Sequence, residues 1–299
     1  MANLAKQTLA LIDETIRRDQ GASYRGHLGK AVAQIKDAYN AEPEARFRSH
    51  LGASIIGETC ERKLWLGFRW AQHRDFNGRL LRLFNRGHQE EARFIALLQT
   101  IGCTVHSVAK DGGQFRISDF GGHFGSAVDC VIVGCPDAPE PILGEFKTHN
   151  DKSFQSLKND GVREAKFGHY AQIQVCMKKL SLPKCLYLAV NKNDDELYGE
   201  IINADAIGDQ ALDRANRIIF SNTSPERLKN ASPSWWECKY CDYSSVCFGK
   251  VAPEENCRTC RFSSPQQDGT WHCTKHDTVL SKEAQLSGCS SYSANPSFV

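Results

Sequence analysis

The sequence predicts an α/β protein in which a mixed β-sheet is flanked by helices and followed by a cysteine-rich C-terminal metal-binding module. Segments with helical apolar spacing alternate with short β-type runs, in the order helix, three strands, helix, two strands, helix. With 41% hydrophobic and 24% charged residues, the 299-residue chain has the composition of a globular protein with a substantial core. After Ser221 the chain becomes rich in Ser, Pro and Cys and loses its periodicity.

The first elements are expected to be helices. Residues 1–48 form a polar helical N-terminal extension, in which apolar residues recur at helical spacing: Leu4, Leu9, Ile12 and Ile16. Ser54 can cap a short following helix. A second helix is expected over 79–99, and Gly102 interrupts the apolar pattern as a helix end does.

The middle of the chain switches to strands separated by Gly and Pro. Strands are expected at 114–117, 126–133 and 142–147, with 135–141 as the turn between the last two. The remaining expected elements are a helix at 164–180, strands at 184–191 and 197–202, and a helix at 204–220.

These patterns divide the chain into three parts. The helical extension covers 1–48, the α/β core covers 49–250, and a zinc-binding module covers 251–299. The last part cannot bury much apolar surface, so we expect bound metal to order it.

Composition also limits the classes of function. The net charge of +2 does not indicate a nucleic-acid binder, so any DNA affinity must come from local basic patches. Candidate patches are Arg17 with Arg18, Arg62 with Lys63, Arg79 with Arg82 and Arg86, and Lys178 with Lys179. No apolar run reaches transmembrane length and the start lacks a secretory segment, so we expect a cytoplasmic protein without membrane contact. In a reducing compartment, thirteen cysteines favour metal ligation over disulfides.

Three polar residues indicate a catalytic site. Glu145 and Lys147 alternate on one expected strand and therefore point to the same face, while Phe146 points to the core. A short bend brings Asp129 beside them. Two carboxylates can hold a hard divalent cation, and a nearby ammonium can orient water or neutralise charge on a phosphate. This set suits metal-assisted phosphodiester hydrolysis.

The flanking sequence strengthens this interpretation. Phe84-Asn85-Arg86-Gly87-His88 lies upstream, and His169-Tyr170-Ala171-Gln172 lies downstream. In this order the motifs resemble the PD-(D/E)XK nuclease superfamily, and its RecB-type members in particular, over roughly residues 50–250. The resemblance implies a restriction-endonuclease-like core.

The resemblance also implies roles for further residues. The Phe146 carbonyl can supply another oxygen to the cation. The extra ligand follows the motif glycine by four positions in RecB-type nucleases, which favours Glu91, with His88 as the second choice. Tyr170 and Gln172 are expected to contact the substrate backbone or to position Lys147.

One cysteine set resembles that of the iron–sulfur nucleases, namely AddB-type helicase-nucleases and CRISPR-adaptation RecB-like exonucleases. Its members are Cys60, Cys238, Cys241 and Cys247. The resemblance implies a [4Fe–4S] cluster that staples the chain over the nuclease core and takes no part in the reaction.

The remaining cysteines allow two groupings. Cys257, Cys260, Cys273 and Cys289 have the spacing of a tetrahedral zinc site, with His272 or His276 as possible substitutes. Alternatively, Cys238 and Cys241 pair with Cys257 and Cys260 in an ordinary zinc ribbon, which leaves Cys60 and Cys247 without partners. The others are expected to be buried or partly buried thiols: Cys103, Cys130, Cys135, Cys176 and Cys185.

Taken together, the chain is expected to be a Mg²⁺- or Mn²⁺-dependent DNA exonuclease with a [4Fe–4S] cluster and Zn²⁺. By resemblance it acts on DNA ends in recombination, repair or replication, with a recombination or replication protein as a possible partner, in a bacterial or phage-infected cell. The alternatives are a structure-specific endonuclease and a non-catalytic nucleic-acid-binding module. A zinc-ribbon adaptor for protein partners explains the tail but not the core motifs.

Overall fold

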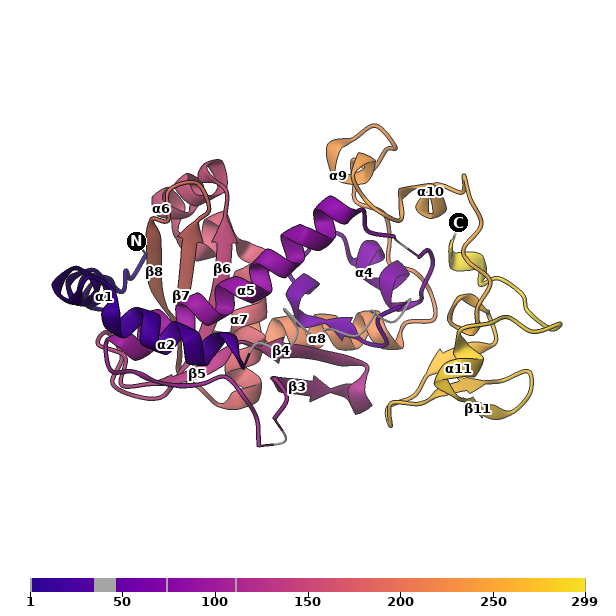
Figure 1. The fold of residues 1–299 in the computed structure, drawn as a ribbon. Coiled ribbons are helices and arrows are strands. Elements are labelled where there is room, and N and C mark those ends of the chain that lie inside the picture. The colour runs from indigo at the N-terminus through magenta and orange to yellow at the C-terminus, as the bar shows by residue number, and fades with distance from the viewer. Residues whose placement is uncertain (1, 35–46, 74, 111, 299) are drawn as a thin grey trace. The chain divides into compact units, whose positions relative to one another are not determined.

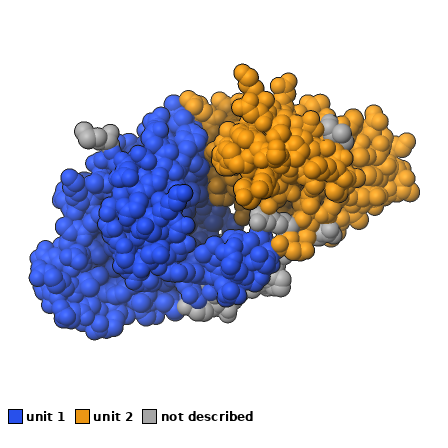
Figure 2. Space-filling view, turned by 90° about the horizontal axis from the view of Figure 1, so that it is seen from above, with its two compact units in different colours: residues 1–44, 76–117, 126–209 blue, residues 45–75, 118–125, 210–299 orange. Residues whose placement is uncertain are grey.

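The computed structural model describes residues 2–34, 47–73, 75–110 and 112–298. The chain forms two compact units, each built from separated segments (Figure 2). Unit 1 comprises Met1–Glu44, Phe76–Ile117 and Ser126–Asp209, and unit 2 comprises Ala45–Asp75, Ser118–Gly125 and Gln210–Val299. Residues 35–46 of the predicted N-terminal extension lie outside the described residues, and the predicted divisions near 48 and 250 stay predictions.

Unit 1 contains a mixed sheet, as predicted, whose five strands lie in the order β2-β5-β6-β7-β8 (Figure 1). Its strands are β2 (Thr104–His106), β5 (Cys130–Val133), β6 (Ile142–His149), β7 (Lys184–Asn191) and β8 (Leu197–Asn203). The strand expected at 114–117 lies in a separate sheet. β6 and β7 are parallel, and the other neighbouring pairs are antiparallel. β6 therefore lies at the centre of the sheet, where both of its edges are hydrogen-bonded.

Four described helices of unit 1 pack on this sheet: α1 (Lys6–Asp19), α5 (Gly78–Thr100), α6 (Asp151–Ala165) and α7 (Phe167–Leu180). A fifth helix, α2 (Ala22–Val32), packs on α5 and α1. The Asn77 side chain caps α5 by accepting a hydrogen bond from the Leu80 amide at 3.0 Å. Phe94 of α5 stacks on Phe146 of β6, with ring centroids 5.0 Å apart, and this contact fixes the second half of α5 to the sheet. None of the helices within the described residues is both long and apolar enough to cross a membrane.

The sequence-based elements differ from the structure at several places. The helix expected after a Ser54 cap begins only at Glu61, where Cys60 caps it, and Ser54 lies in the 3-10 turn Ala53–Ile55. The strand predicted over 126–133 is broken at Asp129 into β4 (Phe124–Val128) and β5. The helix predicted over 164–180 is α7, but α6 precedes it and was missed, although its buried residues Phe154, Leu157 and Val162 recur at helical spacing. β2 was missed because it is only three residues long, and the single-sequence pattern of so short a strand is weak.

Unit 2 is built around short elements. Strand β1 (Leu51–Gly52) pairs in parallel with the start of β4, and β3 (Phe115–Asp119) leads from unit 1 into this region. Its helices include α4 (Glu61–Phe68), most of α8 (Ile207–Phe220), α9 (Trp236–Lys239), α10 (Ser244–Cys247) and α11 (Lys282–Gln285). A small antiparallel sheet, in the order β11-β10-β9, lies in the tail: β9 (Ser263–Pro265), β10 (Trp271–Cys273) and β11 (Thr278–Leu280). Short 3-10 turns complete the set: Ala53–Ile55, Phe120–Gly122, Cys257–Thr259 and Pro296–Phe298.

Buried arginines organise the core of unit 2. Arg258 is only 3% exposed, and its guanidinium lies 3.8 Å from the ring centroid of Trp70 and 4.6 Å from that of Trp271. It donates to Gln285 Oε1 at 2.9 Å and to the carbonyls of Ser49 and Phe68. Burial, together with the neighbouring Arg69, lowers the pKa of Arg258 to about 9. One side chain thus joins segments of unit 2 that are far apart in sequence.

A polar network is buried in unit 1 beside β6. The Tyr187 hydroxyl shares hydrogen bonds with His149 Nε2 at 2.8 Å and with His169 Nδ1 at 3.0 Å. His149 Nδ1 also lies 3.0 Å from the Ser153 hydroxyl of α6. Burial lowers the pKa of His149 to about 4 and that of His169 to about 3, and the nearby charge of Lys147 adds to both shifts. Both imidazoles are therefore neutral at pH 7.

We predict that Arg258→Met destabilises unit 2 by about 3 kcal/mol, because it leaves three buried acceptors without their donor. All five tryptophans of the chain lie in the segments of unit 2, so urea unfolding followed by tryptophan fluorescence reports on this unit. Arg261→Met, at an exposed position, is the matched control and should unfold as the unmodified chain does. Equal midpoints for the two variants would contradict the structural role of Arg258.

A second prediction concerns pH. Because the folded state holds His149 neutral, the unfolded chain binds more protons, and stability is lost as pH falls from about 6.5 towards about 4. His149→Gln should reduce this loss by about 2 kcal/mol between pH 7 and pH 4.5, measured by urea unfolding followed by far-UV circular dichroism. His106→Gln, at an exposed position of unit 1, is the control. An identical pH dependence in all three proteins would rule out the buried network as its source.

Candidate active site

The structure brings Asp129, Glu145 and Lys147 together in unit 1. Cys130 of β5 pairs with Gly144 of β6, so Asp129 lies at the end of β5 next to Glu145. Asp129 Oδ2 accepts a hydrogen bond from the Phe146 amide at 2.8 Å, and Lys147 Nζ forms an ion pair with Glu145 Oε1. A side chain at Gly144 would place its Cβ 2.4 Å from Cys130 Sγ, so only glycine lets the two strands approach here.

Burial dominates the electrostatics of Glu145. Its side chain is 1% exposed, and Oε2 has no hydrogen-bond partner among the described residues. Burial raises the pKa of Glu145 to about 7; Lys147 opposes this shift, while Asp129 and Glu91 add to it. For Lys147, burial lowers the pKa, but Glu145 and Asp129 outweigh burial and leave the pKa raised, so the side chain stays protonated.

Helix α5 contributes the two alternatives for the extra ligand. His88 Nδ1 and Glu91 Oε1 lie 3.6 Å apart on one face of the helix. Burial raises the pKa of Glu91, His88 lowers it, and the charge of Asp129 raises it further. Glu91 therefore belongs to the same electrostatic group as Asp129 and Lys147. The choice between Glu91 and His88 as ligand stays open.

The chemistry of this donor set fits a hard divalent cation. It offers carboxylate oxygens, including the buried Oε2 of Glu145, which has no hydrogen-bond partner in the described part of the chain. Within residues 2–34, 47–73, 75–110 and 112–298, however, no three His, Cys, Asp or Glu side chains are grouped closely enough to hold a metal ion. The metal roles assigned from sequence therefore stay predictions.

Tyr170 and Gln172 lie on α7, where both side chains are buried. The Tyr170 hydroxyl donates to Asp205 Oδ2 at 2.6 Å, and the Asp205 amide donates to Gln174 Oε1 at 2.8 Å. No hydrogen bond from either predicted residue to Lys147 is found in the described chain. Their predicted contacts with a substrate backbone or with Lys147 stay predictions.

Sequence reasoning missed the histidine network next to this group. His149 follows Glu145 and Lys147 at alternate positions of β6, so the same period-two argument could have placed it on their face. No sequence pattern pointed to Asp205, which accepts the hydrogen bond from Tyr170, because Asp205 lies in the connection between β8 and α8.

Four cysteines of unit 2 line one cavity of about 310 Å³: Cys60, Cys238, Cys241 and Cys247. Burial raises the pKa of both Cys238 and Cys241, and the nearby thiol of Cys60 adds to the rise in each. The four cysteines of the predicted iron–sulfur set thus line one cavity. Within the described residues, however, their sulfurs do not lie close enough together to form a metal-ligand group.

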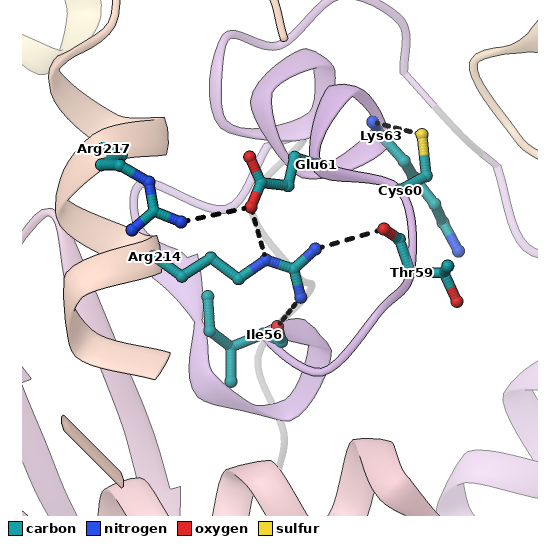
Figure 3. A network of polar contacts seen from close by, with 7 residues as sticks. All are labelled: Ile56, Thr59, Cys60, Glu61, Lys63, Arg214 and Arg217. Carbon is teal, nitrogen blue, oxygen red and sulfur yellow. Dashed lines mark hydrogen bonds and ion pairs between the residues drawn. The ribbon is translucent and has the colours of Figure 1, made fainter. Parts of the chain in front are cut away.

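Cys60 is held by a network of polar contacts (Figure 3). Its Sγ caps α4 by accepting a hydrogen bond from the Lys63 amide at 3.4 Å. Arg214 of α8 donates to the carbonyls of Ile56 at 2.8 Å and Thr59 at 3.3 Å, and it pairs with Glu61 at 3.0 Å. The loop before Cys60 is therefore fixed by a side chain about 150 residues away in sequence.

The second predicted set lines a separate, much smaller cavity of about 20 Å³, together with His276: Cys257, Cys260, Cys273 and Cys289. Burial raises the pKa of Cys257 to about 11, and the other three thiols add to the rise. His276 Nε2 lies 3.7 Å from Cys289 Sγ, whereas His272 pairs with Asp277.

The five remaining cysteines are buried, as predicted: Cys103, Cys130, Cys135, Cys176 and Cys185. Burial raises the pKa of Cys103 to about 11 and holds that of Cys176 above its ordinary value.

No protein-family model and no curated protein matches the chain. Among solved structures, the crystal structure of SSO0001 is similar, with 17% identity and a TM-score of 0.39 over 78% of this chain and 100% of that one. The alkaline exonuclease LHK-Exo from Laribacter hongkongensis is similar at 14% identity over 57% of this chain and 86% of that one, with a TM-score of 0.38, or 0.39 for its complex with dAMP. Likeness at this level assigns no activity to the chain.

Proposed function

We propose that the chain is a metal-dependent deoxyribonuclease that hydrolyses phosphodiester bonds as an exonuclease. The observation that carries this proposal is the group of Asp129, Lys147 and the buried Glu145, in which Glu145 Oε2 has no hydrogen-bond partner among the described residues. Metal-assisted phosphodiester hydrolysis uses such a combination of carboxylates and one ammonium.

The charges of the group support a divalent cation. Burial raises the pKa of both Glu145 and Glu91, the charge of Asp129 adds to each rise, and the charge of Lys147 opposes them. A bound Mg²⁺ or Mn²⁺ would favour the ionised form of these carboxylates, which outnumber the single ammonium of Lys147.

The residues that would hold the cation are Asp129, Glu145 and the Phe146 carbonyl, with either Glu91 or His88. When bound, the cation activates water and neutralises charge on the phosphate. The hydrogen bond from the Phe146 amide orients the Asp129 carboxylate. Lys147 supplies a fixed positive charge for the phosphate oxygens in the transition state. In this proposal Tyr170 and Gln172 contact the substrate backbone.

Two further metal centres form part of the proposal. The cavity of about 310 Å³ lined by the Cys60 set has room for a polynuclear cluster, which supports [4Fe–4S] there. The cavity of about 20 Å³ lined by the Cys257 set has room for a single ion, which supports Zn²⁺. The zinc ribbon joining Cys238 and Cys241 to Cys257 and Cys260 is less favoured, because these pairs line different cavities.

The proposed setting is a cytoplasmic role on DNA ends in recombination, repair or replication, with a partner protein from such a process. In this proposal the protein comes from a bacterium or a phage. The two alternative functions are a structure-specific endonuclease and a non-catalytic binding module. Cleavage of linear and circular DNA distinguishes both from an exonuclease.

Lys147→Ala should lower DNA cleavage by about 10²–10³-fold or more, because a preorganised charge at the phosphate is lost, while DNA binding and folding persist. The assay compares end-labelled linear DNA with closed circular DNA in Mg²⁺, Mn²⁺ or EDTA. Metal-dependent loss of linear DNA alone indicates an exonuclease, and cutting of circles indicates an endonuclease. Lys152→Ala, on the exposed surface of α6, is the control. Intact DNA throughout, from folded protein with its metal load, would favour the binding module.

Cys60→Ser should lower the iron content and the visible absorbance of anaerobically purified protein, because the proposed cluster loses one thiolate. Zinc content should be unchanged. Cys257→Ser is the reciprocal control and should lower zinc but not iron. Loss of zinc from Cys257→Ser alone, with no iron in either variant or in the unmodified chain, would support the zinc-ribbon grouping.

A further inference from the structure

Unit 1 contains a cavity of about 600 Å³ that the proposed mechanism does not use. The cavity is lined by α1, α5, Tyr24 of α2 and the end of the hairpin formed by β7 and β8. All of its lining residues belong to unit 1, and none of them is Asp129, Glu145 or Lys147. A volume of this size is typical of sites that bind small organic molecules.

Much of the cavity lining is apolar. Leu9 and Ile16 of α1 are half-buried and line the cavity. Four further apolar lining residues are at most 9% exposed: Ile12, Phe94, Leu97 and Val190. Apolar surface gains free energy when a ligand removes it from water. The cavity therefore favours a ligand with an apolar body.

The charged lining residues are mostly acidic. They are one cation, Arg93, and four carboxylates: Asp13, Glu90, Asp195 and Glu196. All three guanidinium nitrogens of Arg93 have partners. Nε donates to the Tyr24 hydroxyl at 3.4 Å, and the two terminal nitrogens pair with Glu90 at 3.1 Å and with Asp195 at 3.6 Å. An anionic ligand would therefore meet carboxylates and a cation that is already paired.

Asp13 is the carboxylate that is left for a ligand. It is exposed on α1, and its side chain pairs with no described residue, Arg17 one turn along the helix included. Glu196, in contrast, pairs with Lys158 at 2.6 Å. Four carboxylates stand against two cations, Arg93 and Lys158, which leaves an excess of two carboxylates at the cavity. The charge of the lining thus favours a positive ligand.

We propose that this cavity binds an organic ammonium ion with an apolar body, of the alkylamine class. The apolar chain packs on Leu9, Ile16 and Phe94, and the ammonium group pairs with Asp13. Tyr24 adds an aromatic ring to the lining, a side chain that attracts organic cations. The inference does not depend on the proposed nuclease function, because it uses none of the residues assigned to cleavage.

The test compares two ligands with chains of equal length and opposite charge. The full chain is titrated by calorimetry with decylamine, which is protonated at pH 7, and with decanoate, in about 0.15 M salt. Decylamine should bind about 5-fold or more tightly than decanoate, because one partly exposed ion pair contributes up to about 5-fold. Octylamine should bind up to about 14-fold more weakly than decylamine, since each buried methylene contributes up to about 4-fold.

Two charge variants on neighbouring residues test the role of Asp13. Asp13→Lys should weaken decylamine binding by about 5-fold or more and strengthen decanoate binding, because an attractive charge becomes a repulsive one. Glu14→Lys makes the same change of charge at an exposed position of α1 that does not line the cavity. It should leave both affinities close to those of the unmodified chain, since salt at this concentration screens charges more than about 8 Å apart.

A third variant tests occupancy of the cavity itself. Ile16→Trp places a larger side chain in the lining and should abolish the binding of both ligands. Thermal melting of each variant confirms that folding is retained. If Ile16→Trp does not fold, the comparison of Asp13→Lys with Glu14→Lys decides alone, because both of those positions are exposed.

Three results would overturn the inference. The first is equal affinity of the unmodified chain for decylamine and decanoate, and the second is an equal effect of Asp13→Lys and Glu14→Lys. The third is decylamine binding that persists in folded Ile16→Trp, because the ligand would then lie outside the cavity. None of these results involves DNA cleavage, so the nuclease proposal and this inference stand or fail separately.

Discussion

The burial of Glu145 beside Lys147 is the constraint on which the rest of unit 1 depends. Removing a carboxylate from water costs several kcal/mol, and the ion pair with Lys147 recovers only part of this. The strand that carries both must therefore be held rigidly. β6 lies at the sheet centre with neighbours on both edges, and Phe146, on its opposite face, is stacked on Phe94. The side chain between the two charged residues thus supplies the packing that keeps them in place.

The surroundings of this pair are arranged by small departures from regular structure. The break at Asp129 ends one strand and lets the Asp129 carboxylate turn towards the Phe146 amide. Gly144 allows β5 to approach β6 closely enough for that contact. His149 and His169, which are neutral, supply hydrogen-bonding groups near Lys147 without adding positive charge. The result is a buried group in which carboxylates outnumber cations.

Much of this arrangement could be predicted from local pattern. Period-two alternation placed Glu145 and Lys147 on one face, and apolar runs located β6, β7, β8 and most of α5. Tertiary features could not be found in this way. The stacking of Arg258 between tryptophans joins segments about 190 residues apart, and Arg214 reaches a loop about 150 residues away, so no window of sequence contains either contact. The division into two units was missed for the same reason, because each unit combines separated segments.

The discontinuity of unit 2 has a consequence for synthesis on the ribosome. Ala45–Asp75 emerges long before Gln210–Val299, yet Trp65 and Trp70 pack with residues of the later segment. At elongation rates of about 5–20 residues per second the interval is on the order of ten seconds, during which these large apolar side chains lack their partners. Unit 1 can assemble its sheet during this time, since β8 ends at Asn203. The nascent chain therefore presents a finished sheet and an unfinished second unit, which makes the early tryptophan segment the natural point of chaperone engagement.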